Sequence, residues 1–80
     1  MITKAQHTLD TRGLFCPEPV MMLHSLIADM QVGESVIVYA TDPSTTRDFL
    51  KFCSFLGHQL LKQEEHSGEY HFLIQKGVEE

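Results

Sequence analysis

One stretch decides the fold of this chain: SVIVYATDP, residues 35–43. Its first six residues form a continuous run rich in β-branched side chains, which is typical of a strand buried inside a sheet. The run ends at Asp42-Pro43, which is a helix-start signature with Asp42 as the cap and Pro43 as the first helical residue. The stretch therefore predicts a central strand that leads directly into a helix.

A second helix is predicted before this strand, over residues 17–30. Gly33 marks the turn between the two elements, and a short strand is expected further upstream at residues 7–11. Met21 falls on the side of the helical wheel away from the apolar arc. That arc consists of Val20, Met22, Leu23, Leu26, Ile27 and Met30.

The helix that begins near Pro43 is expected to continue to about Leu56, with Gly57 ending it. Its apolar arc consists of Thr46, Phe49, Leu50, Phe52, Cys53 and Leu56. Two strand-like segments follow, at residues 58–63 and 70–76, around a turn at residues 66–69. The predicted order of elements is βαβαββ.

This order predicts an α+β two-layer sandwich. Each helix has one apolar face, so both helices are expected to pack on the same face of one four-stranded sheet. The strand–helix–strand crossover implies a parallel pair and the final hairpin an antiparallel one, which makes the sheet mixed. We expect residues 1–80 to form a single domain, with residues 1–6 and 78–80 as frayed termini.

Composition excludes several classes of function. The 80 residues carry 11 acidic and 6 basic side chains, for a formal charge of −5, and the basic residues form no cluster that would bind nucleic acid. A protein partner that presents positive charge is the better expectation. No signal peptide and no membrane-spanning stretch is predicted, and the two cysteines lack the spacing of a zinc site. Free thiols fit a reducing cytoplasm.

Cys16 is the candidate reactive residue. With Pro17 as the first helical residue, Cys16 is predicted to be the N-cap, where the helix dipole favours a thiolate. Pro17 and Pro19 remove two backbone donors, and Glu18 adds a like charge that Arg12 can offset. We therefore expect a thiol pKa modestly below its ordinary value. The alternative is a small apolar residue buried at a helix start.

Other candidate groups are weaker. Cys53 lies in the apolar stripe of its helix and is interpreted as a core residue. No histidine stands at an offset that suggests a Cys–His pair; His24 is interpreted as a solvated helix residue, and His58, His66 and His71 as surface residues. A cysteine hydrolase is therefore not expected. The stretch around Asp42 is either only a well-capped helix start or a polar surface at the same sheet edge as Cys16, with Arg47 as a docking residue.

The chain resembles the TusA (SirA-like) family of small sulfur carriers from Thr8 to Gly77. The resemblance rests on Leu9-Asp10, Gly13-Leu14, CPEPVMM at residues 16–22, DP at 42–43, TTRD at 45–48, and Phe52-Cys53. The C-P-x-P core is specific to the wider family, and the longer strings are similar to the branch that serves tRNA thiolation. Phe15 is a departure, because many relatives have a basic residue before the cysteine.

The resemblance implies a carrier rather than a free-standing enzyme. Cys16 would accept sulfane sulfur from a cysteine desulfurase as a persulfide. A downstream relay complex would then take the sulfur toward 2-thiouridine at the tRNA wobble position. No metal, organic cofactor, direct nucleic-acid contact or membrane is implied, and we expect a cytoplasmic monomer. The expected supporting residues are Asp10, Arg12, Gly13, Pro17, Glu18 and Pro19, and the expected partner-binding residues are Met21, Asp42 and Arg47.

Two other classes of function stay open from the sequence. A single-cysteine thiol redox protein would use the same reactive thiol, although the chain has no C-x-x-C motif. A non-catalytic regulator that binds protein or RNA would not need Cys16 at all. Within the carrier interpretation, the sequence leaves open whether sulfur also enters molybdenum cofactor or sulfur-oxidation pathways.

Overall fold

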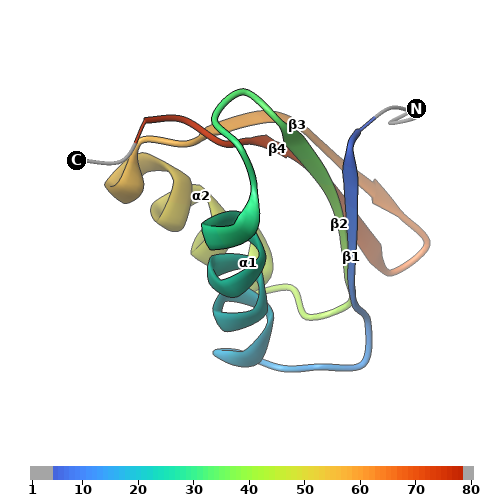
Figure 1. The fold of residues 1–80 in the computed structure, drawn as a ribbon. Helices are drawn as coiled ribbons and strands as arrows, with labels where there is room; N and C mark the ends of the chain where they lie inside the picture. Colours follow the sequence, from blue (N-terminus) through green and yellow to red (C-terminus); the bar gives the residue numbers. More distant parts are fainter. Residues whose placement is uncertain (1–4, 79–80) are drawn as a thin grey trace.

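The fold is a two-layer α+β sandwich. A computed structural model describes residues 5–78 and contains the elements β1 (His7–Thr11), α1 (Glu18–Asp29), β2 (Ser35–Ala40), α2 (Thr45–Leu56), β3 (Gln59–His66) and β4 (Glu69–Gln75). The strands form one sheet in the order β1-β2-β4-β3 (Figure 1). This confirms the predicted class and the βαβαββ order.

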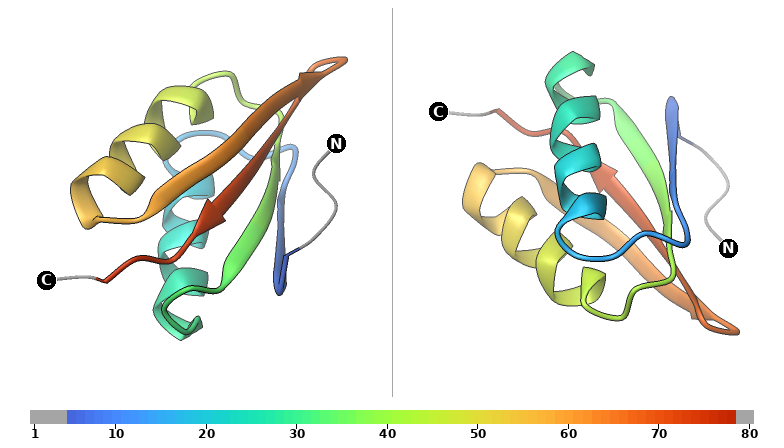
Figure 2. Two further views of the ribbon diagram at one scale, coloured as in Figure 1. Left: turned by 90° about the horizontal axis from the view of Figure 1, so that it is seen from above. Right: turned by 90° about the horizontal axis from the view of Figure 1, so that it is seen from below.

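The sheet is mixed and its two layers are distinct. β1 and β2 are parallel, whereas β4 is antiparallel to both β2 and β3. The two helices lie on the same face of the sheet and leave the other face uncovered (Figure 2). Because β1 and β2 are parallel, the chain leaves both strands at the same edge, and each exit leads into a helix.

The core lies between the helices and the sheet. Each helix contributes a narrow stripe of three buried side chains one turn apart: Pro19, Leu23 and Ile27 from α1, and Thr45, Phe49 and Cys53 from α2. The sheet contributes alternate residues of its central strands, and the rings of Phe49 and Phe72 meet edge to face with centroids 4.7 Å apart. The rest of the buried apolar cluster is Met30, Val36, Val38, Ala40 and Ile74.

The predicted apolar arcs of the helices are wider than the observed buried stripes. Met22 and Leu50 were both expected on the buried side, and both are exposed. A twelve-residue helix that lies on a sheet covers only the side chains at i and i+4 spacing, and the flanks of the arc face solvent. His58 was expected on the surface, but it is buried. Its Nδ1 accepts a hydrogen bond from the Gly77 N–H at 3.0 Å.

The helices also begin later than predicted. Pro17, not Cys16, is the N-cap of α1, and Ser44, not Asp42, is the N-cap of α2. In each case the segment at the proline is a turn before the helix proper: the Glu18 N–H donates to Phe15 O at 2.9 Å, and the Thr45 N–H donates to Asp42 O at 3.0 Å. The Cys16–Pro17 peptide bond is cis.

The ends of the chain were predicted to be frayed. Residues 1–4 and 79–80 lie outside the described residues. Gln6 is ordered by the start of β2, because its Oε1 accepts hydrogen bonds from the backbone N–H and hydroxyl of Ser35 at 2.9 and 3.1 Å. Within residues 5–78, neither helix has the length and apolar character needed to cross a membrane.

A lysine from the end of the chain completes the C-terminus of α1. The ammonium of Lys76 donates to the carbonyl oxygens of Ile27 and Met30 at 2.7 and 2.8 Å. Carbonyls at a helix C-terminus lack intrahelical donors and carry partial negative charge, so a cation is favourable there. α1 has no basic residue in its own last turn, and Lys76 supplies the missing charge.

Substituting Lys76 tests this contact. Lys76→Met keeps the length of the side chain and removes the ammonium, so we expect the free energy of unfolding to fall by about 1.5–3 kcal/mol. Urea denaturation gives the measurement. Lys62→Met, at an exposed lysine on β3, is the matched control, and its effect should stay within about 0.5 kcal/mol. Equal losses in the two variants would contradict the assignment.

Candidate functional site

Two loops meet at one end of the sheet. The loop from β1 to α1 carries Cys16, and the loop from β2 to α2 carries Thr41 and Asp42; both leave the sheet at the lower end of Figure 1. The Gly13 N–H donates to the Thr41 hydroxyl at 2.9 Å, and the Cys16 N–H donates to Asp42 Oδ2 at 2.8 Å. The prediction that Cys16 and the Asp42 stretch share one sheet edge is therefore confirmed.

The carboxylate of Asp42 bridges the two loops. Its Oδ2 accepts the Cys16 N–H at 2.8 Å, and its Oδ1 accepts the Ser44 N–H at 3.0 Å, next to the start of α2. These contacts stabilise the charged carboxylate, so the pKa of Asp42 lies below its ordinary value, chiefly because of the hydrogen bond from the Cys16 backbone. Asp42 therefore fixes where Cys16 sits relative to α2.

Gly13 shapes the loop that carries Cys16. Its φ of 83° lies in the left-handed region, where a side chain is strained. A Cβ on Gly13 would meet no atom within 4 Å, so the constraint comes from the backbone and not from crowding. Gly13 therefore permits the unusual turn by which the chain enters Cys16.

The thiol of Cys16 is exposed, and its surroundings oppose its ionisation. Its pKa is raised above the ordinary value, first because the carboxylate of Asp48 accepts a hydrogen bond from the thiol, and then through desolvation and the charge of Asp48. The hydroxyl of Ser44 and the positive charge of Arg47 act in the opposite direction. The expectation of a modestly lowered pKa is wrong, because sequence alone did not place Asp48 beside the thiol.

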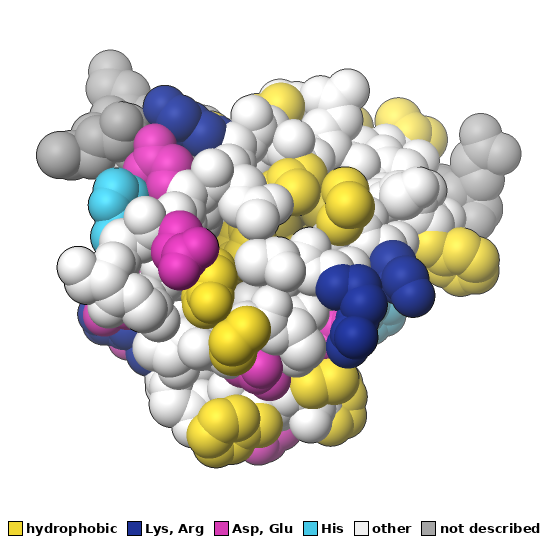
Figure 3. All heavy atoms as spheres, turned by 180° about the vertical axis from the view of Figure 1, so that it is seen from behind, with side chains coloured by type: hydrophobic (Ala, Val, Ile, Leu, Met, Phe, Trp, Pro, Cys, Tyr) yellow, Lys and Arg dark blue, Asp and Glu magenta, His cyan; other side chains and the backbone are white. Residues whose placement is uncertain are grey.

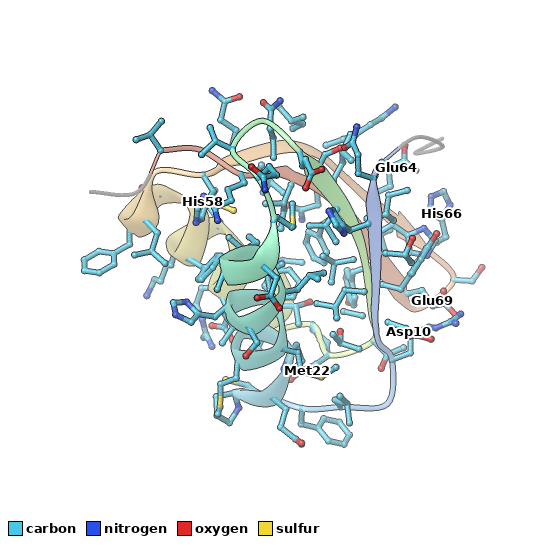
Figure 4. The ribbon with its side chains drawn as sticks, in the orientation of Figure 1. Asp10, Met22, His58, Glu64, His66 and Glu69 are labelled. Carbon is cyan, nitrogen blue, oxygen red and sulfur yellow. The ribbon has the colours of Figure 1, made fainter. Side chains whose placement is uncertain are left out.

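Arg12 does not offset a charge near Cys16. Its guanidinium donates to both carboxylate oxygens of Asp10, with distances of 2.9 and 2.8 Å, lies 3.5 Å from the carboxylate of Glu69, and stacks over the ring of Tyr39. Asp10 and Glu69 lie close together on the side of the sheet away from the helices (Figure 4). The guanidinium lowers the pKa of Asp10 to about 2. The predicted support of Cys16 by Arg12 is therefore wrong.

The residues after Cys16 are split between core and surface. Pro19 is buried and anchors the first turn of α1 against the core, whereas Pro17 and Glu18 are exposed. Glu18 is not among the groups that shift the pKa of the Cys16 thiol most. The like charge that matters at this thiol comes from Asp48 on the other helix.

A shallow apolar groove runs between the two helices near this end. It has a volume of about 400 Å³ and is lined by Val20, Met21, His24, Ser25 and Phe52. The rings of His24 and Phe52 meet edge to face with centroids 5.8 Å apart, which joins the helices across the groove. Met21 is 60% exposed, as its position off the apolar arc predicted.

The surface around the loops is apolar and acidic. Hydrophobic and acidic side chains alternate at the lower end of the molecule in the view from behind (Figure 3). Phe15, next to Cys16, is 69% exposed, and Met22 is also exposed near the start of α1 (Figure 4). Arg47, on α2, is exposed and lies 3.2 Å from Asp48 through its Nε.

The second cysteine provides an internal contrast. Cys53 is 2% exposed in the middle of α2, and burial raises the pKa of its thiol to about 11. A thiol that is both buried and protonated does not react with donors in solution. Both cysteines are free, and the interpretation of Cys53 as a core residue is confirmed.

Sequence reasoning missed two neighbours of Cys16. Asp48 and Ser44 both belong to the start of α2, and Asp48 was noticed only as part of the TTRD string at residues 45–48. The sequence feature that could have placed Asp48 near Cys16 is the position of that string in the first turn of a helix. This helix begins at the same sheet edge as the loop that carries Cys16. Among residues 5–78, no group of three or more His, Cys, Asp or Glu side chains is placed to hold a metal ion.

Fold and site together define a small α+β protein that presents one exposed cysteine just before a helix, beside the first turn of a second helix. The family model described as Sulfurtransferase TusA matches residues 7–76. The chain belongs to the TusA family of sulfur carrier proteins.

Individual relatives agree with this assignment. The chain is 56% identical over 68 residues to a sulfur carrier protein TusA of Pseudomonas putida strain W619, which covers 85% of each protein. It is 56% identical over 69 residues to that of Pseudomonas entomophila strain L48, with 86% of each covered. The crystal structure of a SirA-like protein from Desulfitobacterium hafniense has the same fold, with a TM-score of 0.79, 24% identity, and coverage of 91% of this chain and 100% of that one.

The Asp42 bridge predicts a pH-dependent effect of Asp42→Asn. A carboxyl whose folded pKa lies below its unfolded value of about 3.9 stabilises the fold above that pH, and this stabilisation is lost as pH falls through the folded pKa. Asp42→Asn should therefore lower the urea midpoint at pH 7. The difference from wild type should shrink below about pH 4.

Urea midpoints of both proteins between pH 7 and pH 2 give the measurement. The acid-sensitive groups Asp10 and Glu64, whose pKa values are about 2, are present in both proteins and cancel in the difference. A difference that stays constant across the whole range would show that the charge of Asp42 does not stabilise the loops.

Proposed function

We propose that Cys16 carries sulfane sulfur as a persulfide. The observation that supports this most is the contrast between two thiols in a chain of the TusA family: Cys16 is exposed on an anchored loop, and Cys53 is buried in the core. A carrier thiol must meet a donor and an acceptor in turn, and only Cys16 has the access to do so.

The proposed chemistry needs no redox partner. The sulfur of Cys16 attacks the outer sulfur of a donor persulfide; the bond between the two donor sulfurs breaks, and a bond between Cys16 and the outer sulfur forms. The proton of the Cys16 thiol ends on the donor thiol. In the second half of the cycle, an acceptor thiol attacks the same outer sulfur and regenerates Cys16.

The proposed donor is a cysteine desulfurase, and the proposed acceptor is the next protein of a relay. That relay ends in 2-thiouridine at the wobble position of tRNA, as the sequence resemblance implies. In this proposal the chain acts in the cytoplasm as a monomer, with residues 1–80 as one domain, and it uses no metal or organic cofactor.

The interhelical groove is the proposed docking surface for these partners. It lies beside the loop that carries Cys16, and its rim residue Met21 has a flexible thioether that can adapt to more than one partner. The apolar and acidic surroundings suit a partner that presents an apolar side chain within a basic surface. Asp42 and Arg47 take different parts: Asp42 anchors the Cys16 loop, and Arg47 is free to contact partner carboxylates at its exposed end.

The thiol redox function is less well supported. Redox-sensing cysteines have a lowered pKa and stay partly ionised at neutral pH, whereas the pKa of Cys16 is raised. A stable mixed disulfide between Cys16 and glutathione under mild oxidation would favour the redox function over sulfur transport.

Loading with sulfur tests the proposed role of Cys16 directly. After incubation with a cysteine desulfurase, pyridoxal phosphate and cysteine, intact-protein mass spectrometry should show the wild type heavier by one sulfur atom. Cys16→Ser should abolish this gain and keep the fold, because the residue is exposed. Cys53→Ala should load normally and lose about 1 kcal/mol or more of stability through lost packing. Loading that follows Cys53 would overturn the assignment.

Docking is tested at Met21. A charged side chain at this exposed position should weaken binding to the desulfurase without much change in melting temperature, so Met21→Glu should raise the Kd by about tenfold or more. Isothermal titration calorimetry measures the affinity. Leu61→Glu, at an exposed hydrophobic residue on β3, is the control and should bind normally. A Met21→Glu protein that unfolds would show instead that Met21 belongs to the core.

A further inference from the structure

The loop that carries Cys16 is held by hydrogen bonds rather than by burial. Within residues 12–16 every residue except Leu14 is exposed, and Leu14 is half-buried. An exposed segment with few buried apolar contacts is expected to open easily. Four of its backbone N–H groups nevertheless have acceptors in the protein. The position of the thiol therefore depends on those acceptors.

Two of the four acceptors belong to β1, the strand from which the loop starts. Asp10 Oδ1 accepts the Arg12 N–H at 3.0 Å. Thr11 O accepts the Leu14 N–H at 3.2 Å. Each acceptor lies within three residues of its donor, so these bonds shape the turn but do not tie it to another part of the protein.

The other two acceptors are neighbouring residues just after β2. The Thr41 hydroxyl accepts the Gly13 N–H at 2.9 Å. The Asp42 carboxylate accepts the Cys16 N–H at 2.8 Å. β2 pairs with β1 as far as Ala40, so both acceptors follow directly from the rigid part of the sheet. They hold the loop at its two ends.

The hydroxyl of Thr41 is not needed to start α2. The Thr45 N–H donates to Asp42 O at 3.0 Å, and the Thr46 N–H donates to Pro43 O at 3.3 Å. The first turn before the helix is therefore formed by backbone acceptors, and the hydroxyl of Thr41 serves the Cys16 loop.

We propose that Thr41 is a positioning residue for sulfur transfer, whose hydroxyl holds the start of the Cys16 loop so that the thiol meets a docked partner from one direction. This inference rests on the proposed function of Cys16 as the sulfur-carrying residue. It is separate from the anchoring by Asp42, because Thr41 holds the other end of the loop and carries no charge.

Orientation matters because sulfur transfer is a displacement at the outer sulfur. In loading, Cys16 attacks the outer sulfur of the donor persulfide, the bond between the two donor sulfurs breaks with its electron pair on the donor, and the thiol proton of Cys16 passes to the donor. A docked partner holds its own sulfur in place, so a loose Cys16 loop would lower the fraction of complexes with aligned sulfurs. A small donor in solution approaches from any open side.

Two sulfur donors separate positioning from thiol reactivity. Thr41→Val keeps the shape of the side chain and removes the hydroxyl, and the exposed Gly13 N–H can then bond to water, so the fold should persist. With a cysteine desulfurase as donor, kcat for loading should fall about tenfold and KM for the carrier should stay within about twofold. With glutathione persulfide as donor, the loading rate should stay within about twofold.

Two further variants make this result specific. Thr41→Ser restores the hydroxyl and should restore kcat. Thr46→Val removes a hydroxyl that donates to Pro43 O at 3.0 Å, and it should load like the wild type from both donors. Hydrogen exchange followed by NMR should show the Gly13 amide exchanging about tenfold faster in Thr41→Val and unchanged in Thr46→Val.

The possible outcomes are distinct. Equal losses with both donors would show that Thr41 affects the thiol itself, and this would overturn the positioning role. A normal kcat in Thr41→Val, or a Thr41→Val protein that is unfolded by circular dichroism, would overturn it too. A wild type that loads from neither donor would instead overturn the proposed function of Cys16.

Discussion

The bridge formed by the carboxylate of Asp42 is the interaction on which the rest of the site depends. One side chain accepts the backbone N–H groups of Cys16 and Ser44, at 2.8 and 3.0 Å, and these groups belong to two different loops. The bridge is possible because β1 and β2 are parallel neighbours, so the chain leaves both strands at one edge of the sheet. The fold thus places the two loops together, and Asp42 fixes the distance between them.

The consequence is a thiol whose pKa is shifted mainly by groups at the start of α2 and not by groups of α1. Cys16 lies before α1 and outside it, and the groups that shift the pKa of its thiol most are Asp48, Ser44 and Arg47. Asp48 and Arg47 shift that pKa in opposite directions. A docking partner that changes the charge of either residue would change the reactivity of Cys16 at the same moment. This suits a carrier whose thiol must stay unreactive between its donor and its acceptor.

The two cysteine thiols differ in their access to solvent. Both have a raised thiol pKa, but for different reasons: burial raises that of Cys53, and the hydrogen bond to Asp48 comes first for Cys16. Burial is permanent in the folded protein, whereas a partly buried carboxylate such as that of Asp48 can be neutralised when a partner binds. The same direction of pKa shift therefore has different functional meanings at the two positions.

The sequence predicted the elements well and their ends less well. β2 was predicted at its observed bounds of Ser35–Ala40, because a continuous β-branched run is typical of a buried strand and of few other structures. The helix starts were misplaced because each proline stands in the turn before the helix. The errors at the site came from long-range contacts. Sequence order suggested Glu18 and Arg12 as the charges near Cys16, but Arg12 pairs with Asp10, and the carboxylate that raises the pKa of the Cys16 thiol most belongs to Asp48 of α2.

A pH titration of backbone amide chemical shifts tests the central claim, that one carboxylate holds Cys16 against the start of α2. The amide resonances of Cys16 and Ser44 are followed by NMR from pH 7 to pH 2. The account predicts that both shift together with one midpoint below the ordinary aspartate value of about 3.9, and that both transitions disappear in Asp42→Asn. Two amides with different midpoints, or a Cys16 amide that does not respond to acid, would contradict it.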